Sequence, residues 1–184
     1  MKLKPITAAL FAAGTLLFTS ASFSADRMTK DAYSSEKSRI TAEYKSAMER
    51  CKSLSGNAKD ICKAEAKGKE KSAKADAEAA YKGTNKAATA ALVARADADY
   101  SVAKEKCDDQ SGNAKDVCVK DAKAAHTRAK VDAKANQKVS EVRTDATQDK
   151  RDANYAVAKE RCDALAGDAK TQCVNEAKAR FGKS

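Results

Sequence analysis

Six cysteines are the residues best suited to chemistry in this sequence, and they occur as three similar pairs. Ten residues separate the members of each pair, which are Cys51 and Cys62, Cys107 and Cys118, and Cys162 and Cys173. Such thiols could serve redox exchange, metal binding or disulfide bonding. The Cys-x-x-Cys spacing of redox sites and the closely spaced Cys and His sets of zinc sites are both absent. The spacing therefore favours three local, structural disulfides.

A glycine lies at the middle of each interval and is followed at once by Asn or Asp. These positions are Gly56 and Asn57, Gly112 and Asn113, and Gly167 and Asp168. Glycine readily takes the left-handed conformation that ends a helix, and Asn or Asp can cap the start of the next helix. The sequence predicts that the glycine is the C′ residue of an incoming helix and that the Asn or Asp caps an outgoing one. Each pair is then a helical hairpin whose two cysteines face each other.

His126 is the only histidine, and it lies in a segment rich in Lys and Arg. No acid or nucleophile recurs beside it, so we expect a solvated surface residue. One His and seven Gly also provide no Ser-His-Asp arrangement, no phosphate-binding glycine loop and no metal-ligand set. The sequence therefore predicts no catalytic, metal-binding or cofactor-binding residues, and we expect a protein that is not an enzyme.

The composition limits the fold that can position the cysteines. Residues 26–184 contain only three Leu, two Ile, nine Val and one Phe, which is too little large apolar side chain for a thick globular core. Ala, Lys, Glu and Arg are abundant instead, and these residues are strong helix formers. The sequence predicts long, thin helices that meet along narrow alanine seams rather than a disordered coil.

Apolar residues recur at helical spacing on both arms of each hairpin. One face of the first incoming arm contains Tyr33, Ile40, Tyr44, Ala47, Cys51 and Leu54. A tyrosine lies seven residues before each first cysteine, and we expect these residues to fill the seams: Tyr44, Tyr100 and Tyr155. Alanines flank each second cysteine at steps of four: Ala58 and Ala66, Ala114 and Ala122, Ala169 and Ala177. Such small side chains let two helices approach to the Cα separation of about 4.4–6.8 Å that a disulfide requires.

Two long connectors join the hairpins. Residues 113–165 contain no Gly or Pro and would extend for roughly 80 Å as one helix, although the sequence leaves open whether that helix is unbroken. The earlier connector contains Gly83, Thr84 and Asn85, a stop and start signal that predicts a break. The copies repeat every 56 and then 55 residues, measured from the first cysteine of each pair.

These features together predict an all-α fold. We expect an elongated, coiled-coil-like array of antiparallel helices, joined by three disulfide-clamped hairpins that are centred on Gly56, Gly112 and Gly167. Residues 26–184 would form this single repetitive region, and residues 1–25 would precede it as a signal peptide.

The N-terminus has the three parts of a secretory signal. Lys2 and Lys4 provide a positive start, residues 6–18 are apolar, and residues 19–25 are small or polar with one Phe. We expect cleavage between Ala21 and Asp26 and a periplasmic location. Export agrees with the paired cysteines, since disulfides persist outside the cytosol. The alternative is an uncleaved membrane anchor, because no charge occurs between Lys4 and Asp26.

The chain is basic, with a formal net charge of +10, or +8 without Lys2 and Lys4. Such a charge would attract lipopolysaccharide, anionic lipid or nucleic acid. Asp and Glu are interleaved with the basic residues, however, which is typical of solvated helix faces with local ion pairs. The absence of Trp and the few other aromatic residues argue against nucleic acid stacking. The expected partner is a protein or an anionic envelope component, and the sequence leaves the oligomeric state open.

The repeated motifs resemble a group of small exported proteobacterial proteins labelled TolA-like. The resemblance rests on Tyr-x-x-Ala-Lys-x-(Lys/Arg)-Cys, as in residues 100–107 and 155–162, and on Gly-(Asn/Asp)-Ala-Lys within each pair. The composition is also similar to the long periplasmic helical region of TolA. The resemblance implies a role in the cell envelope. The basic helical arms of periplasmic chaperones such as Skp are a second analogy of build.

The sequence therefore predicts a non-enzymatic periplasmic protein that acts as a structural or interaction module of the envelope. The alternative is a cationic helical chaperone that holds unfolded clients, or a binder of polyanions such as lipopolysaccharide. The two differ in a simple observable, because a holding chaperone suppresses the aggregation of an unfolded client.

Overall fold

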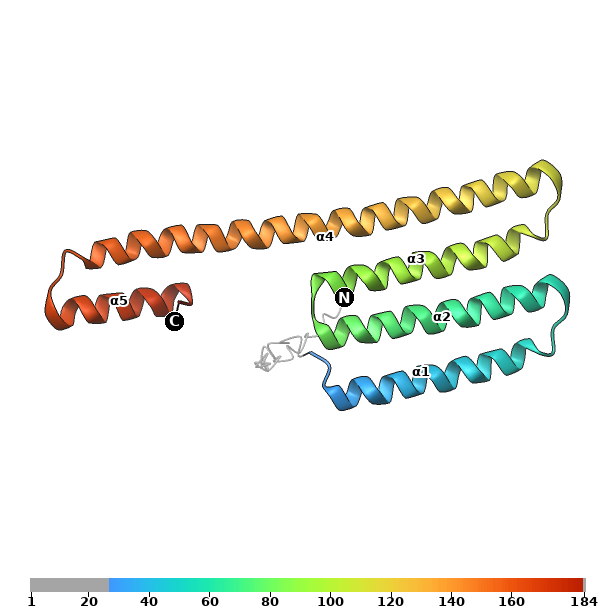
Figure 1. The fold of residues 1–184 in the computed structure, drawn as a ribbon, viewed down its shortest axis with the longest axis horizontal. Helices are drawn as coiled ribbons and strands as arrows, with labels where there is room; N and C mark the ends of the chain where they lie inside the picture. The colour runs from blue at the N-terminus through green and yellow to red at the C-terminus, as the bar shows by residue number, and fades with distance from the viewer. Residues whose placement is uncertain (1–26, 184) are drawn as a thin grey trace, which may run out of the picture.

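The computed structural model describes residues 27–183, and within this range the chain folds into five α-helices with short connections (Figure 1). The helices are α1 (Lys30–Cys51), α2 (Gly56–Lys82), α3 (Asn85–Cys107), α4 (Gly112–Cys162) and α5 (Gly167–Phe181). The predicted all-α array of disulfide-clamped hairpins is confirmed. None of the helices in this range combines the length and hydrophobicity that crossing a membrane requires. The predicted signal peptide lies outside the described residues.

The helices form a single layer rather than a closed bundle. α1, α2, α3 and the first half of α4 lie side by side in antiparallel order, and α5 folds back against the far end of α4 (Figure 1). Among residues 27–183, each helix packs only against its neighbours in the chain. An open layer has little interior, and its buried apolar side chains, apart from three cysteines, are Ile40, Ala66, Ala77, Ala87, Ala91, Ala94, Ala96, Ala133 and Ala177.

α2 and α3 approach each other closely at a glycine. Gly68 of α2 faces Ala98 of α3, and a Cβ atom at position 68 would lie only 2.9 Å from the Ala98 Cβ. Two helices can approach this closely only where one of them lacks a side chain. Small residues therefore replace the bulky core that the composition cannot supply.

The predicted break between α2 and α3 is confirmed. Gly83 ends α2 in the left-handed conformation with a φ of 60°, and its N–H donates to the Ala79 carbonyl at 2.8 Å. Thr84 then caps α3 by accepting a hydrogen bond from the Ala87 N–H at 3.2 Å. The chain reverses here through backbone conformation and capping, without a disulfide.

α4 is one unbroken helix of 51 residues, which corresponds to about 75 Å. α3 reaches along it as far as Ser140, whose Oγ accepts a hydrogen bond from Asn85 Nδ2 at 2.9 Å. α5 meets it near Tyr155, which contacts Phe181. Between these contacts every residue from 142 to 154 is exposed. α4 therefore joins two packed regions through a stretch of solitary helix.

Candidate functional site

The three predicted disulfides form, and each joins the end of one helix to the first turns of the next. The Cα atoms are 5.6, 5.7 and 5.7 Å apart in Cys51–Cys62, Cys107–Cys118 and Cys162–Cys173. All six cysteines lie within residues 27–183 and are paired, so none offers a free thiol. A bridge across so short a loop stabilises the hairpin by about 3 kcal/mol. Disulfides of this kind belong to an oxidising, non-cytoplasmic compartment.

The glycine at each turn has the left-handed conformation that the sequence predicts. The φ angle is 55° at Gly56 and 56° at Gly112 and Gly167. Its place in the hairpin differs from the prediction. The incoming helix ends at the first cysteine, and the glycine is the first residue of the outgoing helix rather than the C′ residue of the incoming one. The extra residues between them let the chain cross from one helix axis to the next.

The prediction that Asn57, Asn113 and Asp168 cap the outgoing helices is wrong, because each lies inside its helix, one residue beyond the glycine. The capping position precedes the glycine, and the residue there makes no side-chain capping hydrogen bond. Asn57 instead donates from Nδ2 to the Glu105 carbonyl and to Asp109 Oδ1, both at 2.7 Å. This side chain therefore links the turn of the first hairpin to that of the second.

The flanking alanines divide into two sets. The alanines that lie four positions after each second cysteine are in the seams and are buried or half-buried: Ala66, Ala122 and Ala177. The alanines that lie four positions before each second cysteine are exposed: Ala58, Ala114 and Ala169. The prediction that these alanines line the seams is therefore wrong. The helices begin to separate at the turn, and the position before the second cysteine faces solvent there.

An ion pair spans the turn in the second and third hairpins but not in the first. Lys115 Nζ lies 2.9 Å from Asp108, and Lys170 Nζ lies 2.9 Å from Asp163. The hydrogen bond from Lys170 holds the pKa of the Asp163 carboxyl below its ordinary value. The first hairpin has lysines at both equivalent positions, so no attraction spans its turn. These pairs are half-exposed and therefore contribute little stability.

The recurring tyrosines face a position that lies eight residues after the second cysteine. In the second hairpin, His126 stacks on Tyr100 with 4.8 Å between the ring centroids. In the third, Phe181 and Tyr155 pack edge to face with 6.3 Å between the ring centroids. The prediction that the tyrosines fill seams is confirmed for these two. The first hairpin has Glu70 at the equivalent position, and therefore lacks a second ring.

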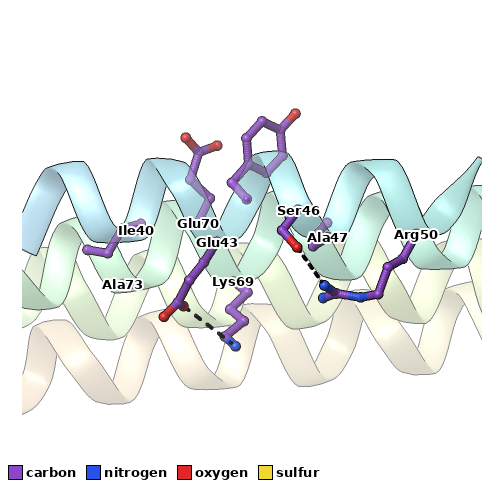
Figure 2. A pocket seen from close by; sticks show the side chains of 10 residues that line it. Ile40, Glu43, Ser46, Ala47, Arg50, Lys69, Glu70 and Ala73 are labelled. Carbon is purple, nitrogen blue, oxygen red and sulfur yellow. Dashed lines mark hydrogen bonds and ion pairs between the residues drawn. The ribbon is translucent and has the colours of Figure 1, made fainter.

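A groove of about 310 Å³ lies between α1 and α2, where Glu70 replaces the aromatic ring of the other hairpins (Figure 2). Its apolar lining includes Ile40, Tyr44 and Ala66. Its rim is charged with both signs: Glu43, Arg50, Lys69 and Glu70. A groove with so balanced a rim has no net attraction for an anion or a cation.

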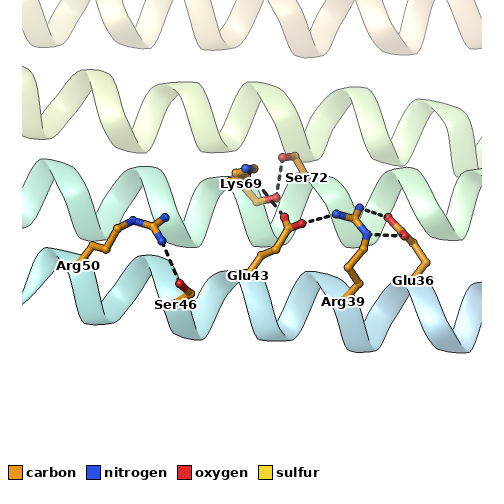
Figure 3. A network of polar contacts seen from close by, with 7 residues as sticks. All are labelled: Glu36, Arg39, Glu43, Ser46, Arg50, Lys69 and Ser72. Carbon is orange, nitrogen blue, oxygen red and sulfur yellow. Dashed lines mark hydrogen bonds and ion pairs between the residues drawn. The ribbon is translucent and has the colours of Figure 1, made fainter.

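The polar contacts beside this groove run mainly along α1 (Figure 3). Arg39 pairs with both Glu36 and Glu43, and Arg50 donates to Ser46 Oγ at 2.9 Å. One long contact crosses to α2, where Lys69 Nζ lies 3.9 Å from Glu43. Because these groups are exposed, the contacts contribute little to stability.

His126 is not the solvated residue that the sequence predicts, since its side chain is only 18% exposed. Its Nε2 lies 2.7 Å from Asp97 Oδ1. Lys71 and Lys130 also contact Asp97, at 3.2 and 3.6 Å, so one carboxylate connects α2, α3 and α4. The hydrogen bond with His126, followed by the effects of Lys71 and Lys130, lowers the pKa of Asp97. The expectation failed because these partners belong to different helices.

A hydrogen bond joins the histidine and the aspartate. Their neighbours are Lys71 and Lys130, the Tyr100 ring that stacks on His126, and Ser101, whose hydroxyl donates to the Asp97 carbonyl at 2.9 Å. In the part of the chain that the structure describes, no group of three or more His, Cys, Asp or Glu residues is arranged to hold a metal ion. The arrangement around Asp97 is suited to clamping three helices together.

Two features of these sites were missed from the sequence. The variable position occupied by Glu70, His126 and Phe181 could have been found, because it lies at a constant distance from the second cysteine of each copy. The cluster around Asp97 gives no such signal, since its lysine and histidine partners come from two other helices. No family model, curated protein or solved structure matches this chain.

Proposed function

We propose that this chain is a non-enzymatic structural protein of the cell envelope, located in the periplasm, in which α4 holds two disulfide-clamped helical regions apart. One region consists of α1, α2, α3 and the first half of α4, and the other is the hairpin of α4 and α5. Each end would present an exposed helical surface to a protein or an anionic envelope component. The TolA-like resemblance of the repeated motifs implies the same setting.

The observation that best supports a spacer is the solitary stretch of α4. Every residue from 142 to 154 is exposed. The polar contacts there include the 2.7 Å hydrogen bond from Gln148 to Asp152 within the helix and an ion pair between Asp152 and Lys183, which lies just beyond α5. A largely polar, exposed helix that joins two packed regions is typical of a bridge between them. The disulfides near both ends limit fraying and support a setting outside the cytosol.

The proposal predicts that the two regions must be joined by an intact helix. In the source bacterium, loss of the protein should make the envelope leak a periplasmic reporter, and the intact chain should restore retention. The variant Asp149→Pro should not restore it, because proline interrupts the solitary helix at a cost of about 3 kcal/mol. Asp149→Ala, which removes the same charge but keeps the helix, serves as the matched control.

Two results would contradict the proposal. Full complementation by Asp149→Pro would show that a continuous α4 is not required. Recovery of the protein in the cytosolic fraction, with its N-terminal segment uncleaved, would remove the periplasmic location.

A cationic holding chaperone is the second candidate, and the open single layer favours it, because both broad faces of the layer are accessible. A holding chaperone should suppress the aggregation of an unfolded client at stoichiometric amounts. If binding depends on the net charge, which is +8 without Lys2 and Lys4, rising salt should weaken it. Absence of protection at every salt concentration would leave the spacer as the better account.

A further inference from the structure

α4 has an apolar stripe on the face that points away from α3 and α5. Its members recur at steps of three and four, and we call this set the outer stripe: Val117, Asp121, Ala124, Arg128, Val131, Ala135, Val139, Val142, Ala146, Lys150, Ala153 and Val157. At 3.6 residues per turn they stay within about 100° of the helix circumference. Its five valines are 48–58% exposed. The residues that face α3 and α5, such as His126 and Tyr155, lie on the opposite side.

The internal repeat shows what covers this face elsewhere in the molecule. The first half of the outer stripe is equivalent to one face of α2, so that Ala124 corresponds to Gly68 and Val117 to Ile61. α3 covers that face of α2, because Gly68 lies against Ala98.

The second half of the stripe is equivalent to the face of α3 that completes the same contact. Ala153 corresponds to Ala98 and Ala146 to Ala91, which is buried. The two halves of α4 therefore contain, in one helix, both sides of the interface that α2 and α3 form with each other.

A straight helix cannot fold its two halves onto each other, and α4 is unbroken. We propose that the outer stripe pairs with the outer stripe of a second copy of this chain. The two α4 helices lie antiparallel about a two-fold axis near Val139 and Val142, so that the first half of each contacts the second half of the other. This arrangement reproduces between two chains the contact that α2 and α3 make within one, and such isologous exchange is a common route to symmetric dimers.

The charges support this pairing. Three ion pairs join α2 to α3: Arg95 with Asp76 at 2.7 Å, Lys71 with Asp97 at 3.2 Å, and Lys106 with Glu65 at 3.7 Å. Two of them have equivalents of the same signs in α4, namely Lys150 with Asp132 and Arg161 with Asp121. The positions equivalent to Lys71 and Asp97 are Thr127 and Asp152, which form no such pair. Asp132 and Lys150 are five turns apart on one helix and cannot meet within a chain. The antiparallel dimer brings each of them to its counterpart on the other copy.

A parallel dimer is excluded by the same residues. In that arrangement Asp121, Arg128 and Lys150 would each face the identical residue of the second copy, and such like-charge layers are destabilising. The antiparallel contact can extend along most of a helix of about 75 Å, which suits the range of about 1,200–2,000 Å² that stable interfaces bury.

Sedimentation equilibrium on the oxidised protein tests the inference directly. The protein should sediment as a dimer at submillimolar concentration. The variant Val131→Glu/Val142→Glu should weaken association about 100-fold or more, because it buries charge in the centre of the interface. The control Thr144→Glu/Thr147→Glu adds the same charge to the opposite face of α4 and should leave the dimer intact. Circular dichroism of both variants checks that α4 stays helical.

A charge exchange tests the antiparallel register. Asp132→Lys alone sets two lysines opposite each other at both symmetric sites, and should weaken the dimer about tenfold. Lys150→Asp alone should have a similar effect. The double variant Asp132→Lys/Lys150→Asp should recover an affinity close to that of the unmodified protein. Recovery can arise only between copies, because the two positions are too far apart within one helix.

A monomeric unmodified protein, or a Val131→Glu/Val142→Glu variant that remains a dimer, would overturn the inference. Failure of the double charge exchange to restore association would overturn the register. The inference rests on the proposed function only in treating α4 as a rigid element. If the unmodified protein is a monomer, the dimer is refuted but the spacer role is not. If the unmodified protein is a dimer and the Asp149→Pro variant is fully functional, the spacer role is refuted but the dimer is not.

Discussion

The two connectors between hairpins begin from the same repeat and end in different structures. The first one breaks at Gly83, so that α2 and α3 fold side by side and bury the alanines between them. The second one continues without interruption as α4, and its middle is exposed on all sides. One hairpin motif thus gives a compact layer at one junction and an extended rod at the other.

Two substitutions between the copies account for the difference. Counted from the second cysteine, Gly83 corresponds to Val139 and Gly68 to Ala124. A β-branched residue strongly disfavours the left-handed conformation that ends α2. An alanine in place of Gly68 would meet Ala98 at 2.9 Å, and the second connector has alanines at both equivalent positions. The absence of a side chain at two positions therefore decides between folding back and running straight.

Removal of a disulfide should produce the largest difference between the two junctions. Cys162→Ser/Cys173→Ser should release α5, because among the described helices α5 packs only on α4, and an isolated helix of 15 residues is marginal in water. The loss of about 3 kcal/mol should appear as fast amide hydrogen exchange throughout residues 167–181. The matched control Cys107→Ser/Cys118→Ser should lower stability, but α3 should stay protected between α2 and α4. Equal loss of protection in the two variants would contradict this contrast.

Gly83→Val should make the first connector resemble the second. The left-handed conformation should cost about 1–2 kcal/mol more than with glycine, and the new Cβ would lie 3.1 Å from Arg27 Cγ. We expect a lower unfolding midpoint in urea and a larger radius of gyration in X-ray scattering, as α2 and α3 separate. Gly83→Asn should have a smaller effect, since Asn tolerates this conformation. An unchanged radius and midpoint for Gly83→Val would show that packing fixes the turn.

Gly68→Ala should destabilise the protein even though alanine is the better helix former. The gain in helix propensity is about 1 kcal/mol, and overpacking costs about 1–3 kcal/mol. Because the 2.9 Å contact joins two Cβ atoms, whole helices must move to relieve it. We expect a net loss of about 1 kcal/mol in urea unfolding. The control Ser101→Ala, at an exposed position on α3, should be close to neutral, and a more stable Gly68→Ala variant would contradict the close approach.

Acid should weaken the packing of α2, α3 and α4 around Asp97. Of the four changes predicted for the two junctions, this one should have the smallest effect on stability. The pKa of Asp97 is lowered in the folded protein, so its contribution is present above the ordinary value of 3.8 and is lost as the pH falls through the lowered pKa. Asp97→Asn should cost less than about 1 kcal/mol near neutral pH, because the carboxylate is 31% exposed. The difference from the unmodified protein should shrink at about pH 2.5. Asp99→Asn, an exposed change on the same helix, should show no such trend.

The sequence by itself determined the parts of this protein that depend on neighbours in the chain. The cysteine pairs, the left-handed glycines and the break at Gly83 all follow from spacing, helix propensity and turn chemistry. These are local properties, since each involves residues within about three helical turns of one another. The periodicity of the apolar positions predicts the covered face of each arm in part. Leu54 lies beyond the end of α1 and is exposed, as are Ala58, Ala114 and Ala169.

Only the tertiary structure decided which distant groups meet. The contact of Asn57 with Asp109, the cluster of His126, Lys71 and Lys130 around Asp97, and the groove beside Glu70 depend on how far one helix slides along the next. Alanine seams are nearly uniform along their length, so composition does not specify that sliding. It is fixed when the hairpin turns, the Gly68 contact and the interhelical polar pairs are satisfied together, which requires the packed helices.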